Sequence, residues 1–113
     1  MNILFVEDHA VFADTVTRQF LSKHSVTVAG TLAAARVEVS NGSFDLALVD
    51  YDLPDGKGDS FVQSIAGSLI IAIGVSSHEK GNEALKRAGA AAICQKMDFD
   101  QIERVIQSVL RRG

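Results

Sequence analysis

The stretch from residue 44 to residue 58 reads FDLALVDYDLPDGKG and holds the sharpest change of character in the chain. Its first part, Phe44–Val49, is a short, mainly apolar run, as expected of a strand buried on both faces. Asp50 ends this run, and turn-forming residues follow it at 52–56. A buried strand that ends in a carboxylate and then turns predicts a polar site just beyond the strand.

Similar strand-like runs lie on both sides of this stretch and alternate with amphipathic segments. The runs are Asn2–Val6, Ser25–Ala29, Leu69–Val75 and Ala90–Gln95. Helices are expected at about residues 11–21, 31–40, 59–65 and 82–88, and a last one from Asp98 or Asp100 onward. Buried strands that alternate with helices predict an α/β fold, a doubly wound, five-stranded parallel sheet with helices on both faces.

Length and composition limit the classes of protein that the chain can represent. With 113 residues, 47% of them hydrophobic, it has room for one domain, residues 1–113, and one core. The formal net charge of −3 and the lack of a basic block argue against direct nucleic-acid binding. No apolar run is long enough for membrane insertion, and the start MNILFVED does not read as a signal peptide. A single cysteine, Cys94, excludes an internal disulfide and suits a cytoplasmic location.

Polar side chains stand where four of the five predicted strands end. They are Glu7, Asp8, Asp50, Ser76, Ser77 and Lys96. A parallel sheet brings its carboxyl ends to one edge, so we expect these side chains to share a pocket. Three carboxylates repel one another there unless a cation intervenes. Mg²⁺ with a lysine and a hydroxyl would suit a site that handles a phosphoryl group.

Each of these residues also has an ordinary structural interpretation. Asp8 could cap the first helix, the two serines could cap the fourth, and Lys96 could be a solvated surface residue. Taken singly, these interpretations are favoured. Their joint placement at the ends of four strands favours a functional site instead.

The whole set resembles the receiver domain of bacterial two-component response regulators, and the resemblance runs along essentially the whole chain. Its most specific part is residues 46–58, an aspartate after an apolar strand followed by Leu53-Pro54 and a glycine. The acidic pair Glu7-Asp8 and the late Lys96 add to it. The resemblance implies a flavodoxin-like fold with strand order 2-1-3-4-5.

The resemblance also implies a role for each acidic residue. Asp50 would be the phosphoacceptor, taking a phosphoryl group from a phosphohistidine on a histidine kinase or a histidine phosphotransfer protein. Asp8 would bind Mg²⁺ directly, with Glu7 assisting. Asp50 and the main-chain carbonyl of Asp52 would complete the protein ligands.

The remaining site residues would contact the phosphoryl group or tune its loss. Lys96 would pair with the phosphoryl group, the Ser76 hydroxyl would follow it on activation, and Ser77 fills the adjacent small-residue position. Asp52 and His78 stand where receivers tune the hydrolysis of the acyl phosphate. Such a protein phosphorylates and dephosphorylates itself and is not a multi-turnover enzyme.

Several positions depart from the receiver pattern. Met97 replaces the proline that usually follows the lysine, which leaves open whether the Lys96–Met97 bond is cis or trans. Ile93 replaces a switching aromatic residue. An ungapped alignment would put Gly74 at the position of the switch hydroxyl, but the apolar run continues to Val75, which favours Ser76.

The region of the fourth helix is also unusual. It is shorter than in most receivers, and Gly81 and Asn82 are expected to weaken the helix. These departures affect the output surface more than the phosphorylation chemistry. The signal would leave through contacts with a downstream protein partner or an attached output domain.

Other readings remain open. The chain could be a pseudo-receiver, an interaction module that works without phosphorylation. Asp50-Tyr51-Asp52 superficially resembles the motif of haloacid-dehalogenase-type phosphatases, but it follows the third predicted strand rather than the first. A nucleotide or flavin binder would need a glycine-rich phosphate loop after the first strand, which the sequence lacks. Cys94, His9 and His24 are interpreted as structural residues.

Overall fold

The computed structural model describes residues 1–112, and for Arg112 only the backbone. The strands are β1 (Asn2–Val6), β2 (Ser25–Ala29), β3 (Leu46–Val49), β4 (Asp52–Leu53), β5 (Gly56–Lys57), β6 (Ile71–Gly74) and β7 (Ala92–Ile93). The helices are α1 (Ala10–Phe20), α2 (Leu32–Asn41), α3 (Gly58–Ile65), α4 (Glu79–Ala88), the 3₁₀ helix η1 (Lys96–Gln101) and α5 (Ile102–Arg112). No described helix combines the length and apolar character needed to cross a membrane.

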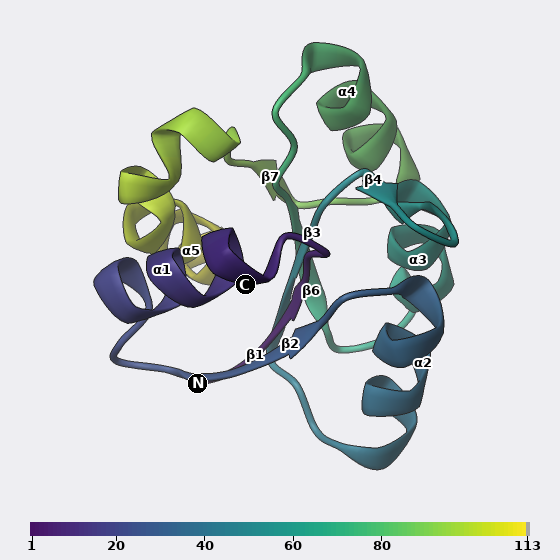
Figure 1. Ribbon diagram of the computed structural model, residues 1–113, viewed down its shortest axis with the longest axis horizontal. Helices are drawn as coiled ribbons and strands as arrows, with labels where there is room; N and C mark the ends of the chain where they lie inside the picture. The colour runs from purple at the N-terminus through teal and green to yellow at the C-terminus, as the bar shows by residue number, and fades with distance from the viewer. Residues whose placement is uncertain (113) are drawn as a thin grey trace.

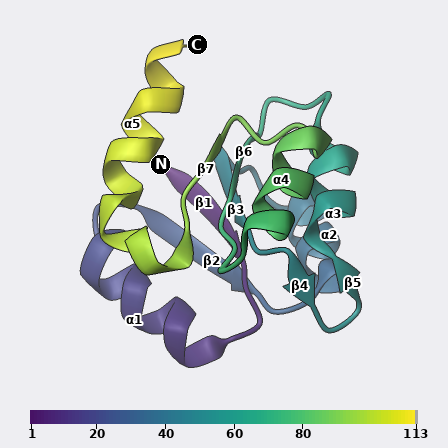
Figure 2. The same cartoon turned by 90° about the horizontal axis from the view of Figure 1, so that it is seen from above.

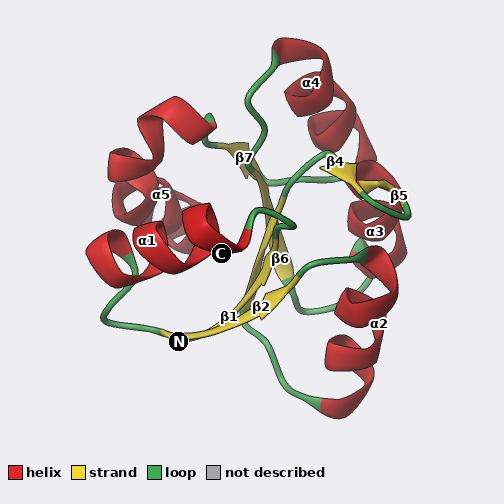
Figure 3. Cartoon of the chain, in the orientation of Figure 1, coloured by secondary structure: helices red, strands yellow, loops and turns green. Residues whose placement is uncertain are grey.

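Five parallel strands form one sheet in the order β2-β1-β3-β6-β7, which confirms the predicted fold and strand order. Helices α1 and α5 cover one face, and α2, α3 and α4 cover the other (Figures 1 and 2). Figure 3 shows the sheet seen edge-on between these two helical layers. The short strands β4 and β5 pair antiparallel in a separate hairpin outside the sheet.

Successive side chains of the central strands enter two different cores. Ile3 and Phe5 pack in the layer under α1 and α5, whereas Leu4 and Val6 pack in the layer under α2, α3 and α4. All four are fully buried. Because a strand turns alternate residues to opposite faces, a strand covered on both sides must be apolar throughout. This explains why β1 and β3 lack the alternation of a half-exposed strand.

The register of the sheet brings the strand ends into line. Val6 pairs with Val49, Val49 with Gly74, and Gly74 with Ile93. The next residue on β1 is Glu7 and the next on β3 is Asp50. The Asp50 N–H still donates to the carbonyl of Val6 over 3.0 Å. Glu7 and Asp50 are therefore neighbours at the carboxyl edge because of the register, not because of any loop.

Three predicted strands are longer than the observed ones. The observed strands β3, β6 and β7 are shorter than the apolar runs that predicted them. Backbone pairing nevertheless continues past β6 and β7, since Val75 N–H donates to Val49 O and Cys94 N–H donates to Gly74 O, both over 2.8 Å. The predicted runs thus extend beyond the regular ladder, and some of their outer residues are not buried, since Leu69 at the start of its run is 98% exposed.

The helix after the fourth sheet strand is longer than predicted. It begins at Glu79 rather than near Asn82, because the Nδ1 atom of His78 accepts the Gly81 N–H and caps the helix. The last helix differs in the other direction. A 3₁₀ turn occupies Lys96–Gln101, and regular α-helix starts only at Ile102.

Helix α3 approaches the main chain of Asp50 so closely that only glycine fits at its first position. The Gly58 N–H donates to the carbonyl of Tyr51 over 2.7 Å. A Cβ atom on Gly58 would lie 1.8 Å from the carbonyl oxygen of Asp50. Gly58 thereby fixes where α3 begins against the end of β3.

We predict that Gly58→Ala lowers the free energy of unfolding by about 3 kcal/mol, because helix α3 must move away from Asp50. Urea denaturation followed by circular dichroism measures the change. Gly67→Ala is the matched control, since nothing lies within 4 Å of its added Cβ. Equal losses in the two variants would contradict the close-approach explanation.

Candidate functional site

Four side chains at the carboxyl edge of β1 and β3 meet in one cluster. Glu7, Asp8, His9 and Asp50 each offer a ligand atom, and these atoms all lie within 4.8 Å of one another. Glu7 and Asp50 are buried, whereas Asp8 and His9 are exposed. The cluster therefore has a buried floor and an accessible rim.

Lys96 supplies the positive charge of this cluster. Its Nζ atom lies 3.0 Å from Asp50 Oδ2, as a hydrogen bond, and 2.9 Å from Glu7 Oε1, as an ion pair without hydrogen-bond geometry. The same ammonium lies 5.2 Å from the centre of the Phe12 ring. Lys96 starts the 3₁₀ helix after β7, and its own N–H donates to the carbonyl of Ser76 over 3.3 Å.

Burial and like charge act together on Asp50. Desolvation raises the pKa of Asp50 above its ordinary value, and the neighbouring Glu7 carboxylate raises it further. Hydrogen bonds from Lys96 and from the Tyr51 N–H oppose this rise without cancelling it. For Lys96, burial alone would lower the pKa, but the close contacts with the Glu7 and Asp50 carboxylates outweigh burial and raise it. Lys96 therefore stays charged.

His9 takes part in the cluster, which the sequence interpretation missed. It precedes α1 as the N-cap residue, as expected of a structural histidine. Its ring Nδ1 nevertheless lies 3.0 Å from Glu7 Oε2 and 3.3 Å from Asp8 Oδ1. Its main-chain N–H also donates to Glu7 Oε2. The position directly after the acidic pair was the only available signal.

The structure separates the two predicted serines. Ser76 is 1% exposed, whereas Ser77 is exposed. Asn82 holds the main chain of Ser76 from both sides, since Asn82 Oδ1 accepts the Ser76 N–H and Asn82 Nδ2 donates to the Ser76 carbonyl. A Cβ on Gly81 would lie 2.7 Å from the Ser76 hydroxyl oxygen. Gly81 and Asn82, expected only to weaken α4, therefore position Ser76.

Gly74 lies within β6 and pairs with Ile93, two residues before Ser76. A Cβ on Gly74 would lie 2.6 Å from the Ile93 side chain. Gly74 is therefore a packing residue of the sheet.

Asp52 and His78 contact each other directly. His78 Nε2 lies 2.8 Å from Asp52 Oδ2, and Lys57 bonds the other oxygen of the same carboxylate. Hydrogen bonds from Lys57 and His78 lower the pKa of Asp52. Because His78 Nδ1 accepts the Gly81 N–H, the ring proton is on Nε2 and points to Asp52. This contact joins the β4–β5 hairpin to the loop before α4.

The backbone of the described residues contains no cis peptide bond, so Lys96–Met97 is trans. Met97 is 83% exposed. Lys96 still reaches both carboxylates from a trans bond, so proline is not required to bring the ammonium to the site.

Cys94 is buried, as expected, and lies just after β7. Burial raises the pKa of its thiol to about 11, with smaller contributions from Asp98 and Asp100. The thiol therefore stays protonated at neutral pH and is no candidate nucleophile. His24 Nε2 lies 2.7 Å from Glu103 Oε1, and neither residue belongs to the acidic cluster. His24 is therefore interpreted as a structural residue, as before.

Family comparison agrees with this geometry. The model of the response regulator receiver domain family matches residues 3–107 of the chain. The chain belongs to this family. No curated protein sequence is significantly similar to this receiver.

Solved receiver structures share its fold. The N-terminal domain of a response regulator/sensory box/GGDEF 3-domain protein from Carboxydothermus hydrogenoformans is 28% identical, with a TM-score of 0.84 over 98% of this chain and 94% of that one. TrrA from Thermotoga maritima, solved with Mg²⁺ and BeF, is 17% identical, with a TM-score of 0.84 over 96% and 97% of the two chains. A Burkholderia pseudomallei response regulator with a phosphorylated aspartic acid and calcium is 19% identical, with a TM-score of 0.81 over 96% and 65%.

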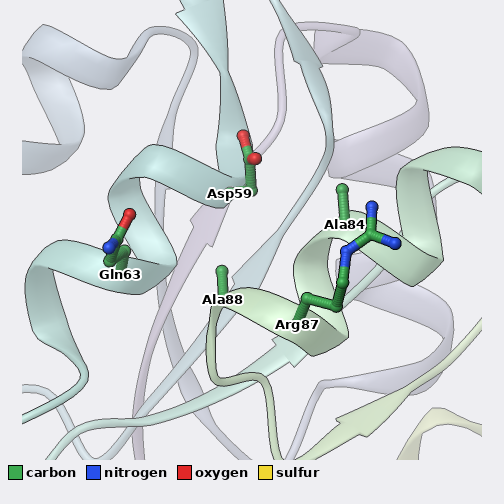
Figure 4. Close-up of a pocket in the computed structure, with 5 residues that line it drawn as sticks. All are labelled: Asp59, Gln63, Ala84, Arg87 and Ala88. Atoms are coloured by element: carbon green, nitrogen blue, oxygen red, sulfur yellow. The ribbon is translucent and has the colours of Figure 1, made fainter.

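A separate hollow of about 260 Å³ lies between α3 and α4 of the receiver. It is lined by Asp59, Gln63, Ala84, Arg87 and Ala88 (Figure 4). None of these residues belongs to the acidic cluster. The hollow is open, and we assign no chemistry to it.

We predict that Asp50→Asn stabilises the metal-free receiver by about 1 kcal/mol at pH 7, since it removes a charge that burial and Glu7 disfavour. The pKa of Asp50 in the folded state lies above its ordinary value of 3.8, so the folded protein holds this proton more tightly than the unfolded chain does. The wild type therefore loses stability as the pH rises from 3.8 to the folded-state pKa. The gain in Asp50→Asn should accordingly vanish in acid below the ordinary value.

Urea denaturation in chelator-treated buffer at several pH values measures this effect. Asp100→Asn, at an exposed position outside the cluster, is the control for the change in net charge. A destabilised Asp50→Asn variant at pH 7, or a gain that persists unchanged in acid, would contradict the interpretation.

Proposed function

We propose that this receiver accepts a phosphoryl group on Asp50. The observation that supports this most strongly is the position of Asp50 beside Lys96, with Nζ and Oδ2 3.0 Å apart, at the edge where Glu7 and Asp8 also lie. A carboxylate held beside an ammonium and near two further carboxylates combines a nucleophile with charges suited to a phosphoryl group.

The chemistry is a transfer between two covalent carriers. An Asp50 carboxylate oxygen attacks the phosphorus of a phosphohistidine, the oxygen–phosphorus bond forms, and the phosphorus–nitrogen bond breaks. The histidine nitrogen leaves with its electron pair and takes a proton. Hydrolysis of the acyl phosphate later returns Asp50 to a carboxylate, so the receiver acts as an acceptor and not as a multi-turnover enzyme.

The residues of the cluster fit a Mg²⁺ ion. Three carboxylates face one ammonium, so the cluster carries excess negative charge, and carboxylate oxygens are ligands that Mg²⁺ prefers. Asp8, Asp50 and the main-chain carbonyl of Asp52 would hold the ion directly, with Glu7 assisting. When bound, the ion would neutralise charge on the phosphoryl oxygens.

Residues around Asp50 would respond to the phosphoryl group or control its lifetime. Lys96 would pair with a phosphoryl oxygen, and the Ser76 hydroxyl would donate to another, with Ser77 as the adjacent small residue. Asp52 and His78 would tune hydrolysis. Their mutual 2.8 Å contact supports treating these two as one unit that is exposed at the rim.

We further propose that residues 1–113 act as a single receiver domain. Its phosphoryl donor would be a histidine kinase or a histidine phosphotransfer protein. The phosphorylated form would act through contacts with a downstream protein or an attached output domain. With Ile93 in place of an aromatic switch residue, the coupling would rely on the loop from Ser76 to α4.

Intact-protein mass spectrometry after incubation with acetyl phosphate and Mg²⁺ tests the proposal. Wild type should gain the mass of one phosphoryl group, and the gain should disappear when the Mg²⁺ is chelated. Asp50→Asn should gain nothing because the nucleophilic oxygen is lost. Asp100→Asn, outside the cluster, should behave as wild type.

Two results would refute phosphoacceptance at Asp50. A wild type that gains no mass would favour a pseudo-receiver that works without phosphorylation. An Asp50→Asn variant that gains as much mass as wild type would place the modification elsewhere.

A further inference from the structure

Strand β2 forms one edge of the sheet, and within residues 1–112 it pairs only with β1. The Ser25 N–H donates to the Met1 carbonyl, and the Glu7 N–H donates to the Ala29 carbonyl. Both ends of β2 therefore turn their hydrogen-bonding groups toward β1. Because these groups alternate along a strand, Thr27 also faces β1. Val26 and Val28 then turn their N–H and C=O groups outward, away from the sheet.

This edge carries none of the usual protection against pairing with another strand. Natural edge strands are blunted by lysines, other charges, prolines or bulges. β2 reads SVTVA, with no charge and no proline, and its register with β1 is continuous over all five residues. The Val28 side chain is 45% exposed. The edge is thus open, apolar and regular.

A groove runs beside this edge on the face covered by α1. It has a volume of about 310 Å³ and is lined by Ala10, Ala13, Asp14, Thr17, Val26 and Val28. The buried hydroxyl oxygen of Thr17 has no hydrogen-bond partner in the described part of the chain. Within this groove Val28 is exposed, whereas Val26 is half-buried against the core under α1.

We propose that a second copy of this chain pairs with β2 in antiparallel fashion about a two-fold axis at Thr27. Val26 of one copy would then stand opposite Val28 of the other, and the reverse. The outward N–H and C=O groups of these residues would form four hydrogen bonds across the axis. The two sheets would become one continuous sheet.

The sequence of the edge favours a second copy over an unrelated peptide. Val26-Thr27-Val28 reads the same in both directions, as a two-fold axis requires. Opposite residues of an antiparallel pair share a face, so the four valines would meet on the α1 side and fill the adjoining grooves. Ser25 would stand opposite Ala29, which places no charge or bulky side chain at the ends.

The charges on α1 do not oppose this pairing. Asp14 and Arg18 form an exposed ion pair on α1, and Asp14 lines the groove. The two-fold axis would bring the α1 helices side by side in opposite directions. Asp14 and Arg18 are the charged residues of α1 and cancel each other, so two copies of this flank would meet without net repulsion.

The dimer would leave both acidic clusters accessible. The two copies of the sheet run in opposite directions, so their carboxyl edges lie at opposite ends of the assembly. The inference therefore does not depend on phosphorylation of Asp50. A five-residue strand gives a small interface, which indicates a weak or transient dimer.

Amide hydrogen exchange by NMR, together with sedimentation, tests the proposal over about two decades of protein concentration. The amides of Val26 and Val28 should become protected as the concentration rises and the protein dimerises. The Thr27 amide should be protected at every concentration, because it bonds β1. This alternation distinguishes strand pairing from general burial.

Two sets of variants sharpen the test. Val28→Lys should weaken the dimer by at least about tenfold, since it places a charge opposite Val26 of the other copy. Val37→Lys is the matched control, because Val37 is an exposed valine on α2, on the other face. Arg18→Asp should weaken the dimer, and the double exchange Asp14→Arg with Arg18→Asp should restore it.

A chain that stays monomeric over the whole concentration range would overturn the proposal. So would a dimer that survives Val28→Lys, or one that protects amides of α4, β7 and α5 instead of those of β2. A monomer whose Val26 and Val28 amides become protected only with an added extended peptide would assign the edge to a different partner and overturn the second-copy proposal.

Discussion

The ammonium of Lys96 lies between two buried carboxylates that come from different strands. Glu7 follows β1, Asp50 follows β3, and Lys96 follows β7, so the contact joins the carboxyl ends of three strands. Burying any one of these charges alone would be costly. Together they remain one negative charge in excess, and the exposed Asp8 adds another. The cluster at the carboxyl edge of the sheet therefore carries net negative charge, which a bound cation would neutralise.

The main chain is held by different contacts beside Asp50 and beside Ser76. On the Asp50 side, Gly58 lets α3 begin directly against the carbonyl of Asp50. On the Ser76 side, Asn82 bonds both the N–H and the carbonyl of Ser76. The rim carries exposed groups instead, among them the paired Asp52 and His78. The buried part is fixed by packing, while the rim is open to solvent and to partners.

Much of this arrangement follows from the sequence. The bounds of β1 and β2 match the predicted runs residue for residue, because Glu7 ends the first apolar run and Gly30 follows the second. The convergence of Glu7, Asp50 and Lys96 followed from parallel topology alone. The roles of Gly81 and Asn82 could not be predicted from the sequence, since helix propensity describes an isolated helix and not its contacts with a neighbouring loop. His78 as a helix cap was missed for the same reason.

A calorimetric titration of the metal-free receiver with Mg²⁺, comparing wild type with Lys96→Met, tests whether the acidic cluster is short of positive charge. If the cluster is short of positive charge, wild type should bind one Mg²⁺ ion, and removal of the competing ammonium should strengthen binding by about tenfold. Circular dichroism before the titration shows that the variant is folded. Absence of saturable binding in wild type, or weaker binding by folded Lys96→Met, would show that the cluster does not lack positive charge.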